Sequence, residues 1–277
     1  MGLIRLALAA LFTAVLTGAA SAAGPKIVSI NLCTDQLALE LADPDQILGL
    51  GPFAVDQLRS PFAERAAAFR RLSGAAEEVI SIRPDLVLAG RYTRRATREL
   101  VRAQGLPLVE LDPPRTVAEA IGQLRDMAAR LGHPERGEAA VVGIERALAA
   151  ARAVASGRRE SVLALQRRGW IAGGGAMIGS IMEAVGLRNA GAELAKGLGR
   201  QVSLEVLVAS RPDLLLLGSA SERADDQGSA LLQHPALRRL WPPDRRLVLP
   251  ERLGASCGGA SLADALAWLT RAVERLP

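Results

Sequence analysis

A short segment of this chain occurs twice. EEVISIRPDLVLAG, residues 77–90, returns as EVLVASRPDLLLLG at residues 205–218. Each copy has a helix-forming part, a proline that stops the helix, and an aliphatic run that ends at glycine. Such a run is typical of a strand that is buried on both faces of a parallel sheet. The duplication predicts two similar α/β lobes with a ligand cleft between them. The alternative is a generic helix-to-strand turn that occurs twice by coincidence.

The first 23 residues differ in character from the rest. Arg5 precedes an apolar run over residues 6–16, and small residues including Ala20-Ser21-Ala22 follow. This pattern predicts a cleavable secretory signal peptide over residues 1–23, and thus a periplasmic protein. A membrane anchor is disfavoured because the run is shorter than the ~20 residues that span a bilayer.

The charge pattern argues against nucleic acid as a partner. The net charge is +5, and the cations are almost all arginines scattered among acidic residues. Nucleic-acid binding would favour a basic cluster with interleaved aromatic residues. The chain has two cysteines, Cys33 and Cys257. An oxidising compartment favours a disulfide between them, while two free, partly buried thiols are the alternative.

Strands alternate with helices on both sides of one long helix, which argues for βαβ units. The long helix, over residues 135–155, lies between the two copies of the repeat, is rich in strong helix formers and contains no proline. We therefore expect two Rossmann-like α/β lobes with parallel sheets, joined by one long backbone helix. The expected units are residues 1–23 (signal peptide), 24–133 (N-terminal lobe), 134–156 (connecting helix) and 157–277 (C-terminal lobe). Within them, the pattern predicts strands at 26–31, 47–51, 86–89, 108–111, 161–166 and 246–249, and helices at 35–41, 62–71, 77–82, 97–104, 116–132, 177–185 and 262–276.

Four segments carry a resemblance to a known family. They are IVSINLCTDQLALELADPDQILGL near the start, RPDLVLAG with the strand that follows it, LGHPERGEAA before the long helix, and CGGASLADAL near the end. In this order, the chain resembles the periplasmic substrate-binding proteins of ABC importers for metal chelates, the group that includes cobalamin-binding and ferric-siderophore-binding proteins. The resemblance covers essentially the whole chain after the leader.

The resemblance implies a monomeric, non-catalytic receptor. It would hold a ferric siderophore or cobalamin between two lobes and deliver it to an inner-membrane permease dimer with its ATPase subunits. In the cobalamin-binding member, one glutamate on each lobe contacts permease arginines, and these glutamates align with Glu77 and Glu205. Their alternative role is that of ordinary acids at a helix start, which the helix dipole favours.

Ligands of open α/β sheets bind beyond the carboxyl ends of the strands. This rule selects residues 31–34, 53–56, 91–95, 167–175 and 253–259. Guanidinium groups pair with carboxylate, phosphate or catecholate oxygens, so the arginines around Tyr92 suit an anionic chelate; a solvated helix start at Thr93 is the alternative. The candidate ligand-binding residues are Cys33, Thr34, Phe53, Arg91, Tyr92, Arg94, Trp170, Gly174, Arg252 and Cys257.

Four other functions compete with the chelate receptor. A bare-metal receptor is disfavoured because only His133 and His234 are present and both precede proline in helix-entry turns, so no protein metal site is expected. A haem receptor with Tyr92 as axial ligand stays open. A secreted thiol hydrolase would need Cys33 or Cys257 as nucleophile and one of the two histidines as base, but neither histidine is near a predicted strand end. A sensor or chaperone on the same scaffold is a further alternative.

Overall fold

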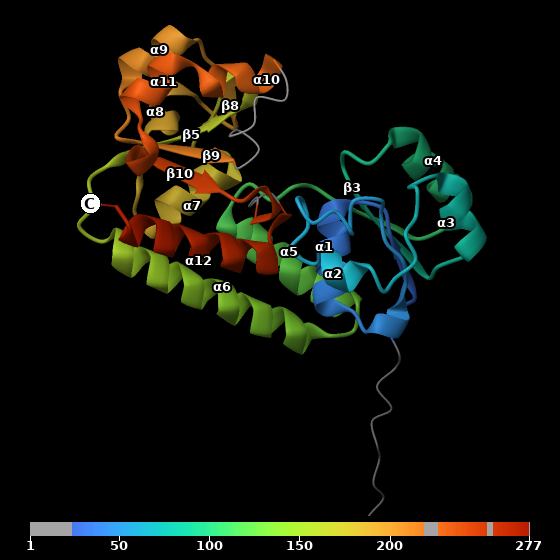
Figure 1. Ribbon diagram of the computed structural model, residues 1–277. Helices are drawn as coiled ribbons and strands as arrows, with labels where there is room; N and C mark the ends of the chain where they lie inside the picture. The colour runs from blue at the N-terminus through green and yellow to red at the C-terminus, as the bar shows by residue number, and fades with distance from the viewer. Residues whose placement is uncertain (1–23, 219–226, 254–256, 277) are drawn as a thin grey trace, which may run out of the picture.

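The computed structural model describes residues 24–218, 227–253 and 257–276. The predicted signal peptide lies outside the described residues. The chain forms two α/β lobes above a long helix (Figure 1). Among the described residues, no helix combines the length and the apolar character that crossing a membrane requires.

The N-lobe is built on a parallel sheet in the order β2-β1-β3-β4. Its apolar side chains alternate between the two faces: Ile27 and Leu88 face one core, while Val28 and Val87 face another. Both faces are thus buried, as expected for a parallel sheet. In chain order, the elements up to the long helix are β1 (Ile27–Ser29), α1 (Leu32–Leu41), η1 (Pro44–Gln46), β2 (Ile47–Gly49), α2 (Ala63–Ala66), α3 (Ala76–Ile82), β3 (Leu86–Gly90), α4 (Arg95–Ala103), β4 (Leu108–Leu111) and α5 (Val117–Arg130).

The C-lobe sheet has the order β10-β9-β5-β6-β8, with β7 also paired to β5. The strands β10, β9, β5 and β7 are parallel, as expected, while β6 and β8 extend the sheet antiparallel. The remaining elements are α6 (Pro134–Ala155), β5 (Ser161–Gln166), η2 (Arg167–Gly169), β6 (Trp170–Ala172), α7 (Met177–Val185), β7 (Arg188–Asn189), α8 (Ala190–Leu194), β8 (Gly199–Gln201), α9 (Leu204–Ser210), β9 (Leu214–Gly218), α10 (Gln227–Ala230), η4 (Leu231–Gln233), α11 (Pro235–Leu240), η5 (Pro243–Arg245), β10 (Arg246–Leu249), η6 (Glu251–Leu253) and α12 (Ala260–Glu274).

The expected helix over residues 62–71 is wrong beyond its first turn. Only Ala63–Ala66 is α-helical. The chain then forms a parallel bridge between Leu50 and Arg71, and Leu72 donates its N–H to the carbonyl oxygen of Leu50 at 2.8 Å. Pairing at the end of β2 therefore takes these backbone groups away from a helix.

The long helix α6 does more than connect the lobes. It packs against α5, α12 and α7, and it lies beside α12 beneath both lobes (Figure 1). Its buried residues, including Ile144 and Leu148, share one apolar cluster with Leu88 of the N-lobe and Leu214 of the C-lobe. A continuous core thus runs through both lobes.

The two copies of the repeat adopt the same local structure. Arg83 and Arg211 end α3 and α9 in the left-handed conformation, with φ of 52° and 43°. The aspartate two residues later has the same role in each lobe: Asp85 accepts the N–H of Lys26 at 2.8 Å, and Asp213 accepts that of Ser161 at 2.7 Å. Each carboxylate therefore fixes the start of the neighbouring strand.

After β10 the chain crosses back to the N-lobe. Cys257 is bonded to Cys33, and an added Cβ on Gly258 would lie 3.1 Å from the Cβ of Ala120 in α5. The helix α12 then runs along α6 beneath the C-lobe (Figure 1). Residues 157–277, expected as the C-terminal lobe, thus include a segment that contacts the N-lobe.

Candidate functional site

A cavity of 290 Å³ lies at the carboxyl edge of the N-lobe sheet. Its walls come from the start of α1, the ends of β3 and β4, the helix α5, and the segment that returns from the C-lobe. The lining residues are Asn31, Cys33, Leu37, Gly90, Arg91, Tyr92, Leu111, Asp112, Pro113, Pro114, Gln123 and Cys257.

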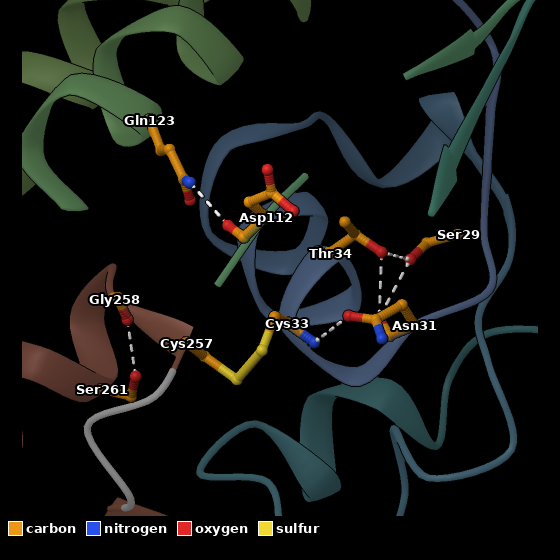
Figure 2. The surroundings of a disulfide bond; sticks show 9 residues. All are labelled: Ser29, Asn31, Cys33, Thr34, Asp112, Gln123, Cys257, Gly258 and Ser261. Atoms are coloured by element: carbon orange, nitrogen blue, oxygen red, sulfur yellow. Dashed lines mark hydrogen bonds between the residues drawn. A yellow bond between two sulfur atoms is a disulfide. The ribbon is translucent and has the colours of Figure 1, made fainter. Parts of the chain in front are cut away.

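The start of α1 forms one wall, and Asn31 organises it. The Asn31 side chain accepts the N–H of Cys33 at 3.0 Å and so caps the helix. A Cβ on Gly90 would lie 2.7 Å from this side chain, so glycine at the end of β3 permits the close approach. Figure 2 shows the hydrogen bond between Asn31 and Cys33 beside the disulfide.

Thr34 was expected to contact ligand, and this expectation is wrong. Its side chain is fully buried. Its hydroxyl donates to the carbonyl oxygen of Asn31 at 2.9 Å and lies 2.7 Å from that of Ser29 (Figure 2). The hydroxyl thus contacts β1 and β3, so Thr34 stabilises the packing of α1 on the sheet.

The second wall carries charge and an exposed phenol. Arg91 Nη1 donates to Asp112 Oδ1 at 3.1 Å, and this hydrogen bond raises the pKa of the Arg91 guanidinium. Gln123 Nε2 in turn donates to the Asp112 carbonyl oxygen at 2.7 Å (Figure 2). Tyr92 is 80% exposed at the same wall. The cavity therefore combines an oriented cation with an exposed phenol.

Cys33 and Cys257 form a disulfide, with their Cα atoms 4.8 Å apart (Figure 2). Of the two alternatives for these cysteines, the structure takes the bonded one. Both residues line the cavity, and because they are bonded, neither offers a free thiol. The thiol-hydrolase alternative thus lacks its nucleophile while the bond is intact.

The other candidate residues do not line this cavity. Arg252 lines a different, more polar cavity of 540 Å³ between the loop after β2 and the helix α12. Phe53 is half exposed, with the guanidinium of Arg59 4.8 Å from its ring centre. Arg94, Trp170 and Gly174 are exposed outside the cavity.

Both histidines are structural. His133 Nε2 lies 3.0 Å from Gln46 Oε1 and 3.1 Å from Asp43 Oδ2, which ties the start of α6 to the N-lobe. His234 Nδ1 accepts the N–H of Ala236 at 3.2 Å at the start of α11. Within the described residues, no group of three or more His, Cys, Asp or Glu side chains is arranged to hold a metal ion.

Behind the cavity wall lies a buried acid that sequence reasoning missed. Asp35 is fully buried on α1, and its Oδ1 accepts the N–H of Gly51 at 3.0 Å. Burial raises the pKa of the Asp35 carboxyl to about 6, although hydrogen bonds from Ser29 and Gly51 lower it in part. The sequence signal for this buried acid was that Asp35 stands among the apolar residues of a predicted helix.

Two polar cavity residues were also missed, namely Asp112 and Gln123, whereas Asn31 lies in the segment 31–34 that the carboxyl-end rule selected. Asp112 directly follows the predicted strand 108–111, so the same rule pointed to its position. Gln123 is the seventh residue of α5, and only the packing of α5 against the sheet brings it to the cavity.

Comparison with known proteins agrees with the fold. A family model for periplasmic binding proteins matches residues 27–242. A cobalamin-binding protein of Halobacterium salinarum is 26% identical over 217 residues, which cover 75% of this chain and 57% of that protein. The chain thus spans little more than half the length of the curated relatives it matches.

Two solved structures show the same architecture. The periplasmic heme-binding protein RhuT from Roseiflexus sp. RS-1, in its apo form, superposes with a TM-score of 0.68 at 25% identity, over 91% of this chain and 98% of that one. A periplasmic heme-binding protein from Pseudomonas aeruginosa superposes with a TM-score of 0.71 at 22% identity, over 90% and 93% of the two chains. Because the family model covers most of the chain and these folds agree with it, this protein belongs to the periplasmic binding protein family.

Proposed function

We propose that this protein is the receptor of an ABC importer and captures a metal chelate, either a ferric siderophore or a corrinoid, between its two lobes. The observation that carries the proposal is the cavity at the carboxyl edge of the N-lobe sheet, where Arg91 and Tyr92 meet the Cys33–Cys257 bridge from the other part of the chain. The kinship with a cobalamin-binding protein supports the same ligand class.

The cavity chemistry suits an anionic chelate with an apolar portion. Arg91 is held in place by Asp112 and still offers further N–H donors to a ligand oxygen. The prolines, the disulfide and Leu111 supply apolar contact beside it. A cavity of 290 Å³ accommodates part of a chelate, so the rest of the ligand would extend toward the C-lobe.

Haem is the second candidate, and Tyr92 favours it. A phenolate is a known axial ligand of haem iron, and this phenol is exposed at the cavity wall. Two solved structures with the same fold are described as heme-binding proteins. On this reading, Tyr92→Phe removes the axial ligand and with it most of the haemin affinity.

Titration of intrinsic tryptophan fluorescence separates these ligands. Purified protein is titrated with cyanocobalamin, haemin, a ferric catecholate and a ferric hydroxamate. We expect saturable quenching with one class, and about tenfold weaker binding in Arg91→Ala because a charge-assisted hydrogen bond is lost. Arg95→Ala is the matched control, since Arg95 is exposed and paired with Glu99 outside the cavity. The absence of any saturable binding by the wild-type protein would refute the proposal.

We further propose that Glu77 and Glu205 dock the receptor on the two halves of a permease. Each is the second residue of its helix, α3 or α9, and each is exposed. A hydrogen bond with the Ser203 side chain lowers the pKa of Glu205 and keeps it ionised. Symmetric carboxylates of this kind orient a charged partner and speed encounter.

Charge reversal tests the docking role. The double variant Glu77→Arg, Glu205→Arg should retain its chelate affinity but lose at least tenfold in uptake by cells that carry the importer. Glu145→Arg is the control, because Glu145 is an exposed glutamate on α6, away from both helix starts. Unchanged uptake by the double variant would show that these residues are ordinary helix-start acids.

A further inference from the structure

A tight turn at the end of β5 holds one arginine in an unusual backbone conformation. Arg168 has φ 59° and ψ 21°, the left-handed region that side chains other than those of glycine and asparagine rarely adopt. The next residue, Gly169, also has a positive φ, and a Cβ there would lie 2.4 Å from the carbonyl oxygen of Val202. Close packing of Gly169 against the backbone of Val202 therefore holds the turn in place.

The turn lies on the edge of the C-lobe that faces the N-lobe. The strands β5, β9 and β10 are parallel, so their carboxyl ends share one edge of the sheet. The chain leaves β10 at this edge and reaches Cys257, which is bonded to Cys33 at the N-lobe cavity. Arg168 follows the carboxyl end of β5. It therefore lies on the edge of the C-lobe that faces a ligand held between the lobes.

The Arg168 side chain has no structural task among the described residues. It is exposed, and it forms no hydrogen bond, ion pair or ring contact with any residue that the structure describes. The two other left-handed arginines differ from it, because Arg83 and Arg211 end helices at the amino ends of β3 and β9. A left-handed residue is common at a helix end, whereas Arg168 lies in the three-residue turn 167–169 that joins the antiparallel strands β5 and β6. Such short hairpin turns use left-handed backbone, so the turn explains the conformation of Arg168 but gives its side chain no partner.

We infer that Arg168 is a specificity-determining residue that recognises a carboxylate on the bound chelate from the C-lobe side, opposite Arg91. This inference rests on the proposed function. A rigid turn places the guanidinium without loss of backbone freedom on binding, and a guanidinium matches a carboxylate in bidentate geometry. Trp170, two residues further on, is 39% exposed on the same turn and reports ligand arrival by its fluorescence.

The test compares one ligand with and without its carboxylates. Haemin carries two carboxylate groups, and haemin dimethyl ester carries none. Arg168→Gly should bind haemin about tenfold more weakly than the wild type, because one charge-assisted hydrogen-bonding contact is lost, and should bind the ester equally well. Glycine suits a positive φ, so the thermal midpoint of this variant should not fall. Arg168→Lys retains the charge and should recover part of the affinity and its dependence on salt.

Arg211→Gly is the matched control, since it makes the same replacement at the same backbone conformation on the opposite edge of the sheet. It should bind both haemin and the ester as the wild type does. Equal haemin affinity in Arg168→Gly and the wild type would overturn the inference, as would a parallel loss for haemin and ester. A wild type that binds cyanocobalamin but not haemin also overturns it and leaves the proposed function standing, whereas a wild type that binds no chelate removes both.

Discussion

At the scale of single residues, the site depends on a few polar groups that the fold holds in place. Asn31 caps α1 and fits against Gly90, while Arg91 is oriented by Asp112. Asp35 is different, because it is a buried acid whose pKa is raised mainly by desolvation. Ionisation of this carboxyl therefore costs the folded state free energy.

Asp35 should therefore make the stability depend on pH. Its pKa rises from 3.8 in the unfolded chain to about 6 in the folded protein, so the folded state binds the proton more tightly. The free energy of unfolding should then fall as the pH rises through the interval between these two values, by about 3 kcal/mol in total. Asp35→Asn should remove most of this decline. Urea unfolding of the wild type and of Asp35→Asn at pH 4 and pH 7 measures this decline in the free energy of unfolding.

The exposed carboxyl of Asp45 supplies the control for this prediction. Hydrogen bonding to Lys26 lowers the pKa of Asp45, so Asp45→Asn should leave the decline between pH 4 and pH 6 in place. If Asp35→Asn shows the wild-type decline, another group is responsible for it.

At the scale of elements, the repeated helix, turn and strand is the unit from which each lobe is built. In both copies an arginine ends the helix and an aspartate accepts the first N–H of the neighbouring strand. The second copy adds a hydrogen bond from the Ser161 hydroxyl to Asp213 at 2.8 Å. The unit therefore joins two strands as well as reversing the chain.

Removal of this carboxylate should destabilise both lobes in the same way. Asp213→Ala leaves the N–H of Ser161 without its partner and should lower the free energy of unfolding by about 1–3 kcal/mol. Asp85→Ala should have a similar but smaller effect, since the N–H of Lys26 lies nearer the surface. Urea denaturation of the two variants measures both losses.

Asp244→Ala is a suitable control, because Asp244 is exposed in η5 and forms no ion pair with the described residues. It should change stability by less than about 0.5 kcal/mol. If Asp213→Ala and Asp85→Ala lose no more stability than this control, the carboxylates are not needed. The backbone of the turn would then be sufficient to position the neighbouring strand.

At the scale of the whole molecule, the lobes are joined three times: by α6, by the return of the chain after β10, and by the disulfide between α1 and the segment before α12. A shared apolar cluster runs through these connections. Large independent motion of the lobes would break that cluster, so the structure favours a receptor that binds its ligand with little rearrangement.

Loss of the disulfide should weaken both the fold and the site. The bond closes a loop of 224 residues, and such a closure contributes at most about 5 kcal/mol by restricting the unfolded chain. The variant Cys33→Ser, Cys257→Ser should therefore unfold at a lower temperature, and its chelate affinity should fall because one cavity wall is no longer held. Differential scanning calorimetry and fluorescence titration measure the two effects.

Reductant provides the internal control. Dithiothreitol should lower the thermal midpoint of the wild type toward that of the double variant and leave the double variant unchanged. A double variant with wild-type stability and affinity would mean that packing of α12 on α6 alone holds the lobes together.

Local patterns in the sequence were sufficient to predict individual strands and helices and the protein family. Strand β5, helix α7 and strand β10 begin and end where their patterns predict, because hydrophobic periodicity and proline are local signals. The twofold repeat predicted the two lobes. The carboxyl-end rule placed Cys33, Arg91, Tyr92 and Cys257 at the cavity, because the end of a strand is also a local signal.

Which of these residues meet at the cavity depends instead on how the elements pack together. The helix expected to reach residue 71 ends early, because the backbone near Arg71 pairs with Leu50 instead. Thr34 is buried against the sheet, while Gln123 reaches the cavity from α5. Arg252, although it follows β10, is carried to a separate cavity. Such outcomes depend on contacts between residues far apart in the chain, and these contacts form only when the sheets, α6 and α12 pack together.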